Sequence, residues 1–445
     1  MNRPVPLPLE EPDTSFSTSG GTSVRRTVLP SGVRVLTEHV PAARSTSVGY
    51  WVGVGSRDER PGQFGSTHFL EHLLFKGTGT RSALDIAVSF DAVGGEHNAA
   101  TAKEYTCYYA RVRDVDLPMA VAVIGDMVTS SVLEAEAFDV ERSVILEELA
   151  MAADDPADLA GEAFFASAYA DHPLGRPIGG TPDSIRAVRR DDVVSHYQEH
   201  YAPNGIVVTA AGAVDHERFC TLVDAVFASA QPARPNPRRT AEPAAAPLAP
   251  RVEVIARPTE QVSVIRGSHG LDLRDERRPV LSVLNAVLGG GMSSRLFQEV
   301  RERRGLAYAV SSFAPAYLDN GVFGVYAGCA PDNVVALLGI VDDEFQRMAD
   351  DGITPTELAR AKGQIEGALT LSLEDSDARM TRLGRSELGV GEFTDLSTAL
   401  ARVDEVTVDA VLDLARDLLT RPVVTAVVGA VDSSRIERVA ARSGA

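Results

Sequence analysis

The sequence contains few cysteines, and they lie too far apart to form a cross-linked scaffold. Cys107, Cys220 and Cys329 are the only three in 445 residues. An odd number at such wide spacings excludes a disulfide framework and a Cys-x-x-Cys metal site. The three thiols fit a reducing compartment, where we expect each to be a small buried apolar residue.

Long apolar runs are also absent. Nowhere do about 20 consecutive apolar residues occur, as a transmembrane helix would require. Residues 1–22 are rich in Pro, Ser, Thr and Glu, and they lack the basic segment followed by an apolar segment that marks a secretory signal. These absences predict a soluble, cytoplasmic protein with no membrane partner.

Basic residues are scarce relative to acidic ones. The 43 Lys and Arg residues are outnumbered by 62 Asp and Glu residues, which gives a net charge of −19. Nucleic-acid binding depends on neutralising phosphates with cations, so this balance argues against nucleic acid as a partner. The charge would suit a basic partner or substrate, and it also favours solubility.

The chain contains enough apolar residues for large cores. Hydrophobic residues make up 44% of it and charged residues 24%, close to the globular average. Its length corresponds to two or three domains. Residues 230–250 are rich in Ala and Pro and show no hydrophobic period, as expected of a linker. We therefore predict a flexible head at 1–22, a domain at 23–229, a linker at 230–250 and a second domain at 251–445.

The two halves resemble each other. The run Arg57-Asp58-Glu59-Arg60 recurs 217 residues later as Arg274-Asp275-Glu276-Arg277, and Tyr109-Ala110 recurs at the same offset as Tyr326-Ala327. The amphipathic stretches 117–130 and 333–347 align as well. Three features at one offset indicate an internal duplication. Helix-like segments include 66–76, 83–93, 117–131 and 185–200. Strand-like and helix-like segments in both halves predict an α+β fold of two homologous domains, each a mostly antiparallel sheet packed with helices.

The sharpest motif is His68-Phe69-Leu70-Glu71-His72. Positions i and i+4 of a helix lie on one face, so the two imidazoles can share a metal ion. Around the helix axis, Glu71 lies at an angle between the two histidines. From there its carboxylate can reach a metal-bound water rather than the ion itself. The H-x-x-E-H order inverts the common zinc-protease motif. The alternative is that both histidines merely cap or pack a helix.

A catalytic zinc takes three protein ligands and leaves the fourth position for water. Glu141 and Glu148 are seven residues apart and share a face of the helix predicted over 134–153, whereas Glu147 points elsewhere. Burying a carboxylate is costly unless it is paired or ligated. The residues alone make Glu148 a candidate ligand without excluding Glu141. The apolar neighbours that indicate burial are Val144, Ile145, Leu146 and Leu149.

Several runs together resemble one family. They are His68–His72 with the following Leu73–Thr78, Asn98–Thr101, Val144–Glu148 and His172–Arg176. The chain resembles the M16 (pitrilysin) metallopeptidases over residues 25–440, and within them the β subunit of the mitochondrial processing peptidase and its bacterial counterparts. The resemblance implies one zinc ion held by His68, His72 and Glu148. It also implies that Glu71 is the general base and that Glu141 helps to hold the arrangement of histidine and water.

The same resemblance assigns substrate-binding residues. It places Asn98 and Ala99 on an edge strand that pairs with the substrate backbone, a role that main-chain hydrogen bonds can fulfil. From the residues alone, Asn98 is also typical of a turn after Gly94-Gly95. In the second half, Arg301 and Tyr308 match a pair that stabilises the substrate carbonyl, which suits amide hydrolysis. Without the resemblance, Arg301 reads as part of a solvated helix end.

The second half does not repeat the metal motif. At the offset of 217, His68, Glu71 and His72 fall on Asn285, Leu288 and Gly289. The second domain therefore keeps the fold without the metal, which predicts one zinc per chain. His196 and His200 are also four residues apart but have no downstream ligand, so we expect no second metal site there.

These patterns predict a zinc endopeptidase that hydrolyses extended peptides in an enclosed chamber. Two alternatives remain: a non-catalytic scaffold or core subunit of the same family, and a metal hydrolase with non-peptide substrates. The resemblance implies a working enzyme of four such domains, of which one chain supplies two. Because this chain has both the zinc residues and the Arg301/Tyr308 pair, we predict a homodimer in which each subunit completes the other's site.

Overall fold

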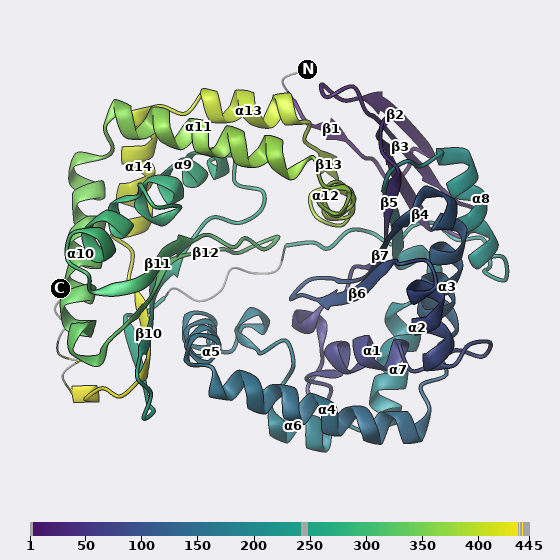
Figure 1. The fold of residues 1–445 in the computed structure, drawn as a ribbon, viewed down its shortest axis with the longest axis horizontal. Helices are drawn as coiled ribbons and strands as arrows, with labels where there is room; N and C mark the ends of the chain where they lie inside the picture. Colours follow the sequence, from purple (N-terminus) through teal and green to yellow (C-terminus); the bar gives the residue numbers. More distant parts are fainter. Residues whose placement is uncertain (1–2, 242–247, 435, 437, 439–445) are drawn as a thin grey trace. The chain divides into compact units, whose positions relative to one another are not determined.

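The computed structural model describes residues 3–241, 248–434, 436 and 438. The chain forms two compact units, and each consists of segments that are discontinuous in sequence (Figure 1). Unit 1 comprises residues 1–149, 177–239 and 369–399, and unit 2 comprises residues 150–176, 240–368 and 400–445. No helix among the described residues is both long and apolar enough to span a membrane.

Unit 1 is built on a seven-stranded sheet with the order β2-β3-β4-β8-β5-β7-β6. All neighbouring strands are antiparallel except β4 and β8. Its central strands β4, β8 and β5 are buried almost throughout, because helices pack on the sheet: α3 on β5, and α12 on β8. The strands are β2 (Asp13–Ser17), β3 (Ser23–Val28), β4 (Arg34–His39), β5 (Ser45–Val52), β6 (Glu96–Thr101), β7 (Thr106–Arg113) and β8 (Ile206–Gly212).

The helices of unit 1 cover the amphipathic stretch 117–130 and the helix predicted over 134–153. They are α1 (Ser66–Leu74), α2 (Ala83–Asp91), α3 (Leu117–Ser130), α4 (Ala135–Asp154), α6 (Pro182–Ala187), α7 (Arg190–His200), α8 (His216–Val226) and α12 (Ser376–Leu388). Short 3₁₀ turns are η1 (Ser56–Asp58), η2 (Asp114–Asp116) and η4 (Pro203–Gly205). The last residues of α4 belong to unit 2.

Unit 2 contains a five-stranded sheet with the order β11-β12-β10-β14-β9. Its strands are β9 (Arg251–Ala256), β10 (Val262–His269), β11 (Ala307–Phe313), β12 (Val322–Cys329) and β14 (Val424–Gly429). Its helices are α5 (Pro156–Tyr169), α9 (Arg278–Gly289), α10 (Val334–Asp351), α11 (Pro355–Ser372) and α14 (Val408–Leu419), and α13 (Leu396–Asp404) spans the unit boundary. The remaining turns are η3 (Pro173–Gly175), the π-helical η5 (Phe297–Glu302) and η6 (Pro331–Asn333).

The predicted duplication is confirmed strand by strand. The order β4-β8-β5-β7-β6 in unit 1 corresponds to β9-β14-β10-β12-β11 in unit 2. Among the described strands, each sheet has one parallel pair, and it occupies the same place in both sheets. The two pairs have the same register 217 residues apart: Arg34 pairs with Val207, and Arg251 pairs with Val424. The structure therefore has the predicted α+β fold class, with two homologous sheets packed with helices.

The two halves exchange one helix each. α5, from the first half of the sequence, packs on β14 and β10 of unit 2, and α12, from the second half, packs on β8 and β5 of unit 1. The boundaries predicted at 23–229 and 251–445 assign each helix to the other unit. The reason for the difference is the burial of α5's apolar residues, such as Phe164, against Ala426 and Val428 of the unit 2 sheet.

Buried ion pairs fix α12 on unit 1. Glu387 of α12 lies 3.0 Å from Arg26 of β3, and both side chains are fully buried. Arg34 and Arg238 also bind Glu387, at 3.3 and 2.8 Å. Removing one partner of such a buried pair would leave an uncompensated charge, so this network specifies where α12 docks.

The predicted flexible head is ordered from residue 3, which corrects that prediction. β2 is an edge strand on β3, and β1 (Val5–Pro6) pairs with β13 (Glu392–Phe393). The reason is apolar burial: Leu7 is almost fully buried in a cluster with Trp51 and Phe393. In the predicted linker, residues 230–241 and 248–250 contain no helix or strand.

Candidate metal centre

Helix α1 carries the three residues of the His68–His72 motif. Its buried side, including Phe69, Leu70 and Leu73, packs into the core of unit 1. The carboxylate of Glu59 accepts hydrogen bonds from the backbone N–H groups of Gly65 and Thr67 at 2.8 and 2.7 Å. An acid at this position is favourable because it pairs with the free N–H groups at the start of a helix. The core contacts and this cap fix the orientation of α1.

His68, His72 and Glu148 come together as a possible metal-binding group. One donor atom from each lies within 4.8 Å of the others. Glu148 Oε2, from α4, is 3.7 Å from His68 Nε2 and 3.4 Å from His72 Nε2. Two donors about 2.1 Å from a tetrahedral zinc ion lie about 3.4 Å apart. The three residues therefore fit zinc in number, type and spacing.

Glu141 has a different position from Glu148. Its side chain is 2% exposed, and its Oε2 lies 3.0 Å from His72 Nδ1, on the side of the ring opposite Nε2. A carboxylate only accepts, so His72 Nδ1–H donates and Nε2 is left free to bind a metal. This is the usual arrangement of a carboxylate behind a metal-binding histidine. The prediction that Glu141 helps to hold His72 agrees with this geometry.

His68 is the more buried of the two candidate histidine ligands. Burial lowers the pKa of His68, and the neighbouring His72 acts in the same direction. Its Nδ1 is buried and has no hydrogen-bond partner among the described residues. A neutral imidazole is the form that ligates metals. The environment of His68 therefore favours its metal-binding form.

Glu71 belongs to the same helix but not to the metal-binding group. The hydroxyl of Thr101, at the end of β6, donates a hydrogen bond to Glu71 Oε2. This contact orients one carboxylate oxygen and ties Glu71 to the sheet. Glu71 therefore lies on the same helix as the two histidines and outside the possible metal-binding group, and its role as general base stays a prediction.

Asn98 and Ala99 lie on β6, which is at the edge of the unit 1 sheet. β6 pairs only with β7 among the described strands. Asn98 is exposed, and its side-chain oxygen accepts a hydrogen bond from the backbone N–H of Ala99 at 2.8 Å. The alternative that Asn98 belongs to a turn is wrong. Pairing of this edge with a substrate stays a prediction.

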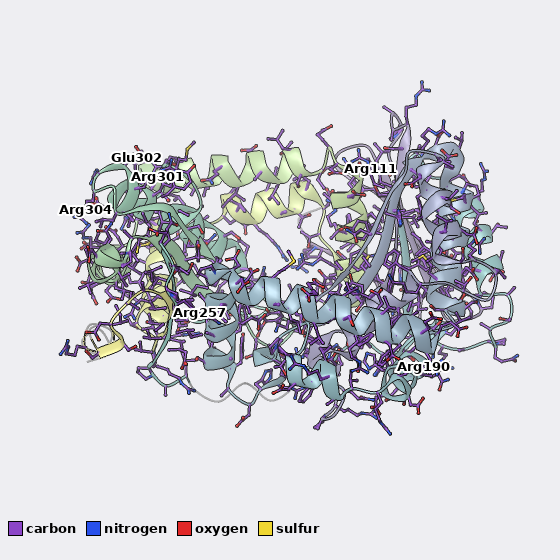
Figure 2. The ribbon with its side chains drawn as sticks, turned by 60° about the horizontal axis from the view of Figure 1, so that its bottom comes forward. Arg111, Arg190, Arg257, Arg301, Glu302 and Arg304 are labelled. Atoms are coloured by element: carbon purple, nitrogen blue, oxygen red, sulfur yellow. The ribbon has the colours of Figure 1, made fainter. Side chains whose placement is uncertain are left out.

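Arg301 and Tyr308 contact each other within unit 2. The Arg301 guanidinium carbon lies 4.4 Å from the centre of the Tyr308 ring and 4.8 Å from that of Phe297. Tyr308 is 75% exposed. Figure 2 shows Arg301 close to Glu302 and Arg304 at one end of this unit. The two residues form one cation–π pair, and their role toward a substrate stays a prediction.

A second H-x-x-E-H sequence occurs in unit 1, at His196-Tyr197-Gln198-Glu199-His200 on α7. Its two rings are 4.5 Å apart, but no acid joins them in a metal-binding group among the described residues. His196 Nε2 lies 3.1 Å from the Thr67 hydroxyl. Glu199 pairs with Arg60 instead. The expectation of no second metal site stays a prediction.

The three cysteines lie away from the candidate metal-binding residues in sequence and are buried. Cys107, Cys220 and Cys329 are buried and unpaired, as predicted, and burial raises the pKa of each thiol.

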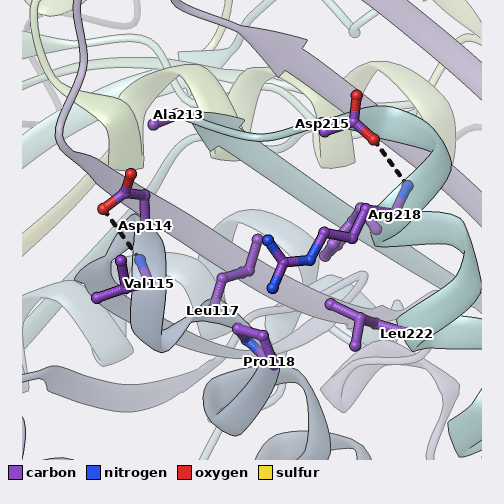
Figure 3. A pocket seen from close by; sticks show the side chains of 9 residues that line it. Asp114, Val115, Leu117, Pro118, Ala213, Asp215, Arg218 and Leu222 are labelled. Atoms are coloured by element: carbon purple, nitrogen blue, oxygen red, sulfur yellow. Dashed lines mark hydrogen bonds between the residues drawn. The ribbon is translucent and has the colours of Figure 1, made fainter.

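A cavity of about 170 Å³ lies between η2 and α8 (Figure 3). It contains none of the predicted site residues; its lining includes Asp114, Leu117, Asp215 and Arg218.

Three contacts around the His68–His72 motif were not predicted from the sequence. It gave no role to Glu59, which caps α1, to Thr101, which binds Glu71, or to Lys76, whose Nζ lies 2.5 Å from Glu141 Oε1. The partners are 8, 30 and 65 residues apart in the sequence. No periodicity connects such distant positions. Only Lys76, four residues after His72 at the end of a helix, could have been suspected to share a partner with it.

Known proteins resemble the chain over both halves. The family model described as Insulinase (Peptidase family M16) matches residues 34–182, and that described as Peptidase M16 inactive domain matches residues 187–365. A Streptomyces coelicolor protein named an uncharacterized zinc protease is 50% identical over 428 residues, covering 94% of this chain and 92% of the relative. A Mycobacterium bovis protein with the same description is 47% identical over 414 residues, covering 92% and 94%.

A solved structure, described as a protease from Helicobacter pylori, has a TM-score of 0.84 and covers 96% of this chain and 100% of its own. At 22% identity, this likeness supports the fold alone. The sequence relatives and the two family models support the family assignment, because together they span both halves of the chain. The chain belongs to peptidase family M16.

Proposed function

We propose that the protein is a zinc-dependent endopeptidase that hydrolyses extended peptides. The observation that carries the proposal is the convergence of His68, His72 and Glu148 donor atoms within 4.8 Å, with Glu71 beside them on α1. Three ligands with a fourth position open are characteristic of catalytic rather than structural zinc. The zinc-protease names of the relatives support the same chemistry.

The residues of this chain have distinct roles in that reaction. When bound, a zinc ion supplies Lewis-acid chemistry, lowering the pKa of water and polarising a carbonyl group. Glu71 accepts the proton of the attacking water and delivers it to the leaving amine. The hydrogen bond from Thr101 holds the Glu71 carboxylate in one orientation while it does so.

The edge strand β6 supports a peptide as substrate rather than a small ester or amide. Its outer edge has no neighbouring strand among the described residues, so an extended chain can add to it through main-chain hydrogen bonds. Thr101 ends this strand and contacts Glu71. A peptide bound along Asn98 and Ala99 would therefore approach the general base.

The proposal extends to assembly. One chain supplies two homologous units, and in the proposed homodimer the Arg301 and Tyr308 of each subunit stabilise the substrate carbonyl at the other subunit's zinc site. Two copies related by a twofold axis would enclose one chamber and contain two composite sites.

The test measures zinc content and cleavage together. Purified protein should contain one zinc per chain and cleave members of a diverse quenched-fluorescence peptide library. A chelator should abolish cleavage, and added zinc should restore it. Stoichiometric zinc without cleavage of any peptide would favour the scaffold alternative. A clear preference for non-peptide esters or amides in a parallel assay would overturn the peptidase assignment.

A further inference from the structure

The carboxylate of Glu141 lies buried between two nitrogen groups. Its Oε2 is 3.0 Å from His72 Nδ1, and its Oε1 is 2.5 Å from Lys76 Nζ. The Glu141 side chain is 2% exposed, whereas that of Lys76 is 38% exposed. A buried carboxylate is costly unless its oxygens are paired. Lys76 supplies the one full positive charge that these contacts provide.

The backbone holds Lys76 in place to make this contact. Lys76 follows the end of α1, and its N–H donates to the Leu73 carbonyl at 3.0 Å. The next residue, Gly77, has a φ of +135° and forms an isolated bridge with Ser82, so the chain turns away sharply after Lys76. From this position the Lys76 side chain reaches the same carboxylate as His72.

The contact with Lys76 has a consequence for His72. If one Glu141 oxygen is held by the cation, the other stays directed at Nδ1, and His72 keeps the tautomer whose Nε2 is the free donor. That Nε2 lies 3.4 Å from Glu148 Oε2. Without the cation, Glu141 Oε1 loses its ion pair and the carboxylate can rotate away from the ring.

The second half of the chain lacks this whole arrangement. At the offset of 217, His72, Lys76 and Glu141 fall on Gly289, Ser293 and Leu358. The second half therefore lacks the counterparts of Lys76, Glu141 and His72 as well as those of the metal-binding residues. A purely structural ion pair between α4 and the end of α1 would not need to follow the metal site in this way.

We propose that Lys76 is a positioning residue of the metal site, acting through Glu141 to fix the tautomer and orientation of His72. The proposal rests on zinc binding at His68, His72 and Glu148, which is part of the proposed function. It does not require that the protein cleave peptides.

The test compares Lys76→Met with Lys76→Arg and with Arg81→Met. Arg81 pairs with Asp126 at 2.5 Å a few residues further on, so its loss removes a similar ion pair that does not touch the metal residues. The zinc dissociation constant is measured by competition with a chromophoric chelator. Substituted Co²⁺ gives a visible spectrum that reports ligand geometry. Thermal unfolding without metal shows whether each variant is folded.

We expect Lys76→Met to bind zinc about 10-fold more weakly, since partners behind a ligand typically affect affinity by about 10–100-fold. Its Co²⁺ spectrum should change, Lys76→Arg should restore most of the affinity, and Arg81→Met should match the wild type. Glu141→Gln should cause a similar loss, and the double variant Lys76→Met/Glu141→Gln should show no further loss.

An unchanged zinc affinity in folded Lys76→Met would overturn the proposal, as would losses that add fully in the double variant. Failure of the proposed function gives a different result: wild-type protein that binds zinc but cleaves nothing. In that case the affinities of the variants still decide the role of Lys76.

Discussion

Unit 1 contains the same five-residue pattern twice, on α1 and on α7, and among the described residues only the α1 copy belongs to a possible metal-binding group. In both, two histidines four residues apart place their rings within 5 Å, at 4.8 Å on α1 and 4.5 Å on α7. On α1 a third residue, Glu148 of α4, reaches both rings. On α7 the neighbouring acids are already paired: Glu199 binds Arg60, and Asp58 binds Arg239.

The state of the ring nitrogens differs as well. On α1, Glu141 occupies His72 Nδ1 and leaves Nε2 free. On α7, His196 Nε2 contacts the Thr67 hydroxyl, and burial lowers the pKa of His196 to about 3. Burial lowers the pKa of His200, Glu199 and Asp58 oppose this shift, and Arg60 and Arg239 add to it. Because burial also lowers the pKa of His68 on α1, the protonation state does not distinguish the two copies. Two imidazoles at helical spacing therefore do not make a metal site. On α1 an acid from another helix, Glu148, supplies the third ligand atom.

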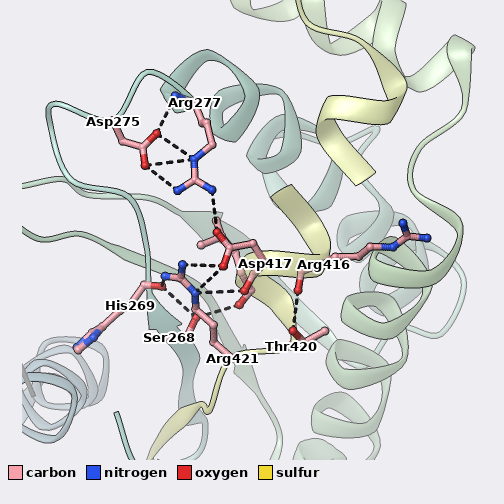
Figure 4. A network of polar contacts seen from close by, with 9 residues as sticks. Ser268, His269, Asp275, Arg277, Arg416, Asp417, Thr420 and Arg421 are labelled. Atoms are coloured by element: carbon pink, nitrogen blue, oxygen red, sulfur yellow. Dashed lines mark hydrogen bonds and ion pairs between the residues drawn. The ribbon is translucent and has the colours of Figure 1, made fainter. Parts of the chain in front are cut away.

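The homologous halves give a second contrast. The α9 positions that correspond to His68, Glu71 and His72 face β11, where the Ser312 hydroxyl donates to the carbonyl of Asn285 at 3.0 Å. In unit 1, Glu59 of the run Arg57–Arg60 caps α1. In unit 2, the corresponding run Arg274–Arg277 belongs to a network in which Arg277 binds Asp275 and Asp417, and Arg421 binds Asp417 (Figure 4). The last arginine of the charged run binds an acid in both units, Arg60 with Glu199 and Arg277 with Asp417, so the difference lies in the Glu59 cap of α1.

The largest expected effect is on zinc affinity, and it differs between the two H-x-x-E-H motifs. His72→Ala should weaken zinc binding by more than the roughly 100-fold upper range for residues behind a ligand, because it removes one of three ligands. His200→Ala, at the same position of the α7 copy, should leave zinc affinity unchanged. Isothermal titration with zinc measures both. Equal losses would mean that α7 also contributes to metal binding.

The second prediction concerns which chain completes the α1 site. Glu71→Gln and Tyr308→Phe should each be nearly inactive alone. When mixed and allowed to exchange subunits, they should recover about a quarter of wild-type activity, because half of the dimers then contain one intact site of two. Native mass spectrometry verifies that heterodimers form. Heterodimers without activity would show that Tyr308 acts within its own chain or has no role.

A third prediction addresses why the second half has no room for a histidine. A Cβ at Gly289 would lie 2.5 Å from the Ser312 backbone nitrogen. Gly289→Ala should therefore lower the free energy of unfolding by about 1–3 kcal/mol. Gly339→Ala, in α10 with open space around it, should be neutral or slightly stabilising. Chemical denaturation compares them, and similar values would disprove close packing at Gly289.

The smallest effect concerns the α7 copy and pH. The pKa of buried His196 is lowered to about 3, whereas an unfolded histidine titrates near 6.5. Between these values the unfolded chain binds the extra proton, so stability is present above pH 6.5 and falls as the pH falls. The contribution is about 1.4 kcal/mol per pH unit. In metal-free protein, His196→Asn should show a correspondingly shallower loss of unfolding free energy between pH 6.5 and 5. An equal slope would contradict a neutral buried His196.

The sequence predicted most of the elements that position the site. The helix expected over 66–76 is α1, and those expected over 83–93 and 117–131 are α2 and α3 within two residues at each end. Their strong apolar period explains the agreement. The helix expected over 185–200 is two helices, α6 and α7, which separate at Val188 and Arg189, both in extended conformation.

Other features depended on contacts that sequence patterns do not encode. The sequence did not predict the exchange of α5 and α12, because it does not reveal which sheet each helix covers. The hydrophobic period of a helix is the same whether it packs on the sheet of unit 1 or on that of unit 2. Val144 was expected to be buried, but it is 44% exposed, while Ile145 is in the core. The H-x-x-E-H pattern predicted the candidate ligands on α1, but only the distant Glu148 distinguishes it from the copy on α7.

The most direct test of the account compares Glu71→Gln with Glu199→Gln, the same substitution in the two copies of the motif. Glu71→Gln should keep one zinc per chain and lose peptide hydrolysis by about 10²–10⁴-fold, the usual contribution of a general base. Glu199→Gln should keep both zinc and activity. Appreciable cleavage by zinc-loaded Glu71→Gln, or a comparable loss in Glu199→Gln, would contradict the assignment of the catalytic centre to α1.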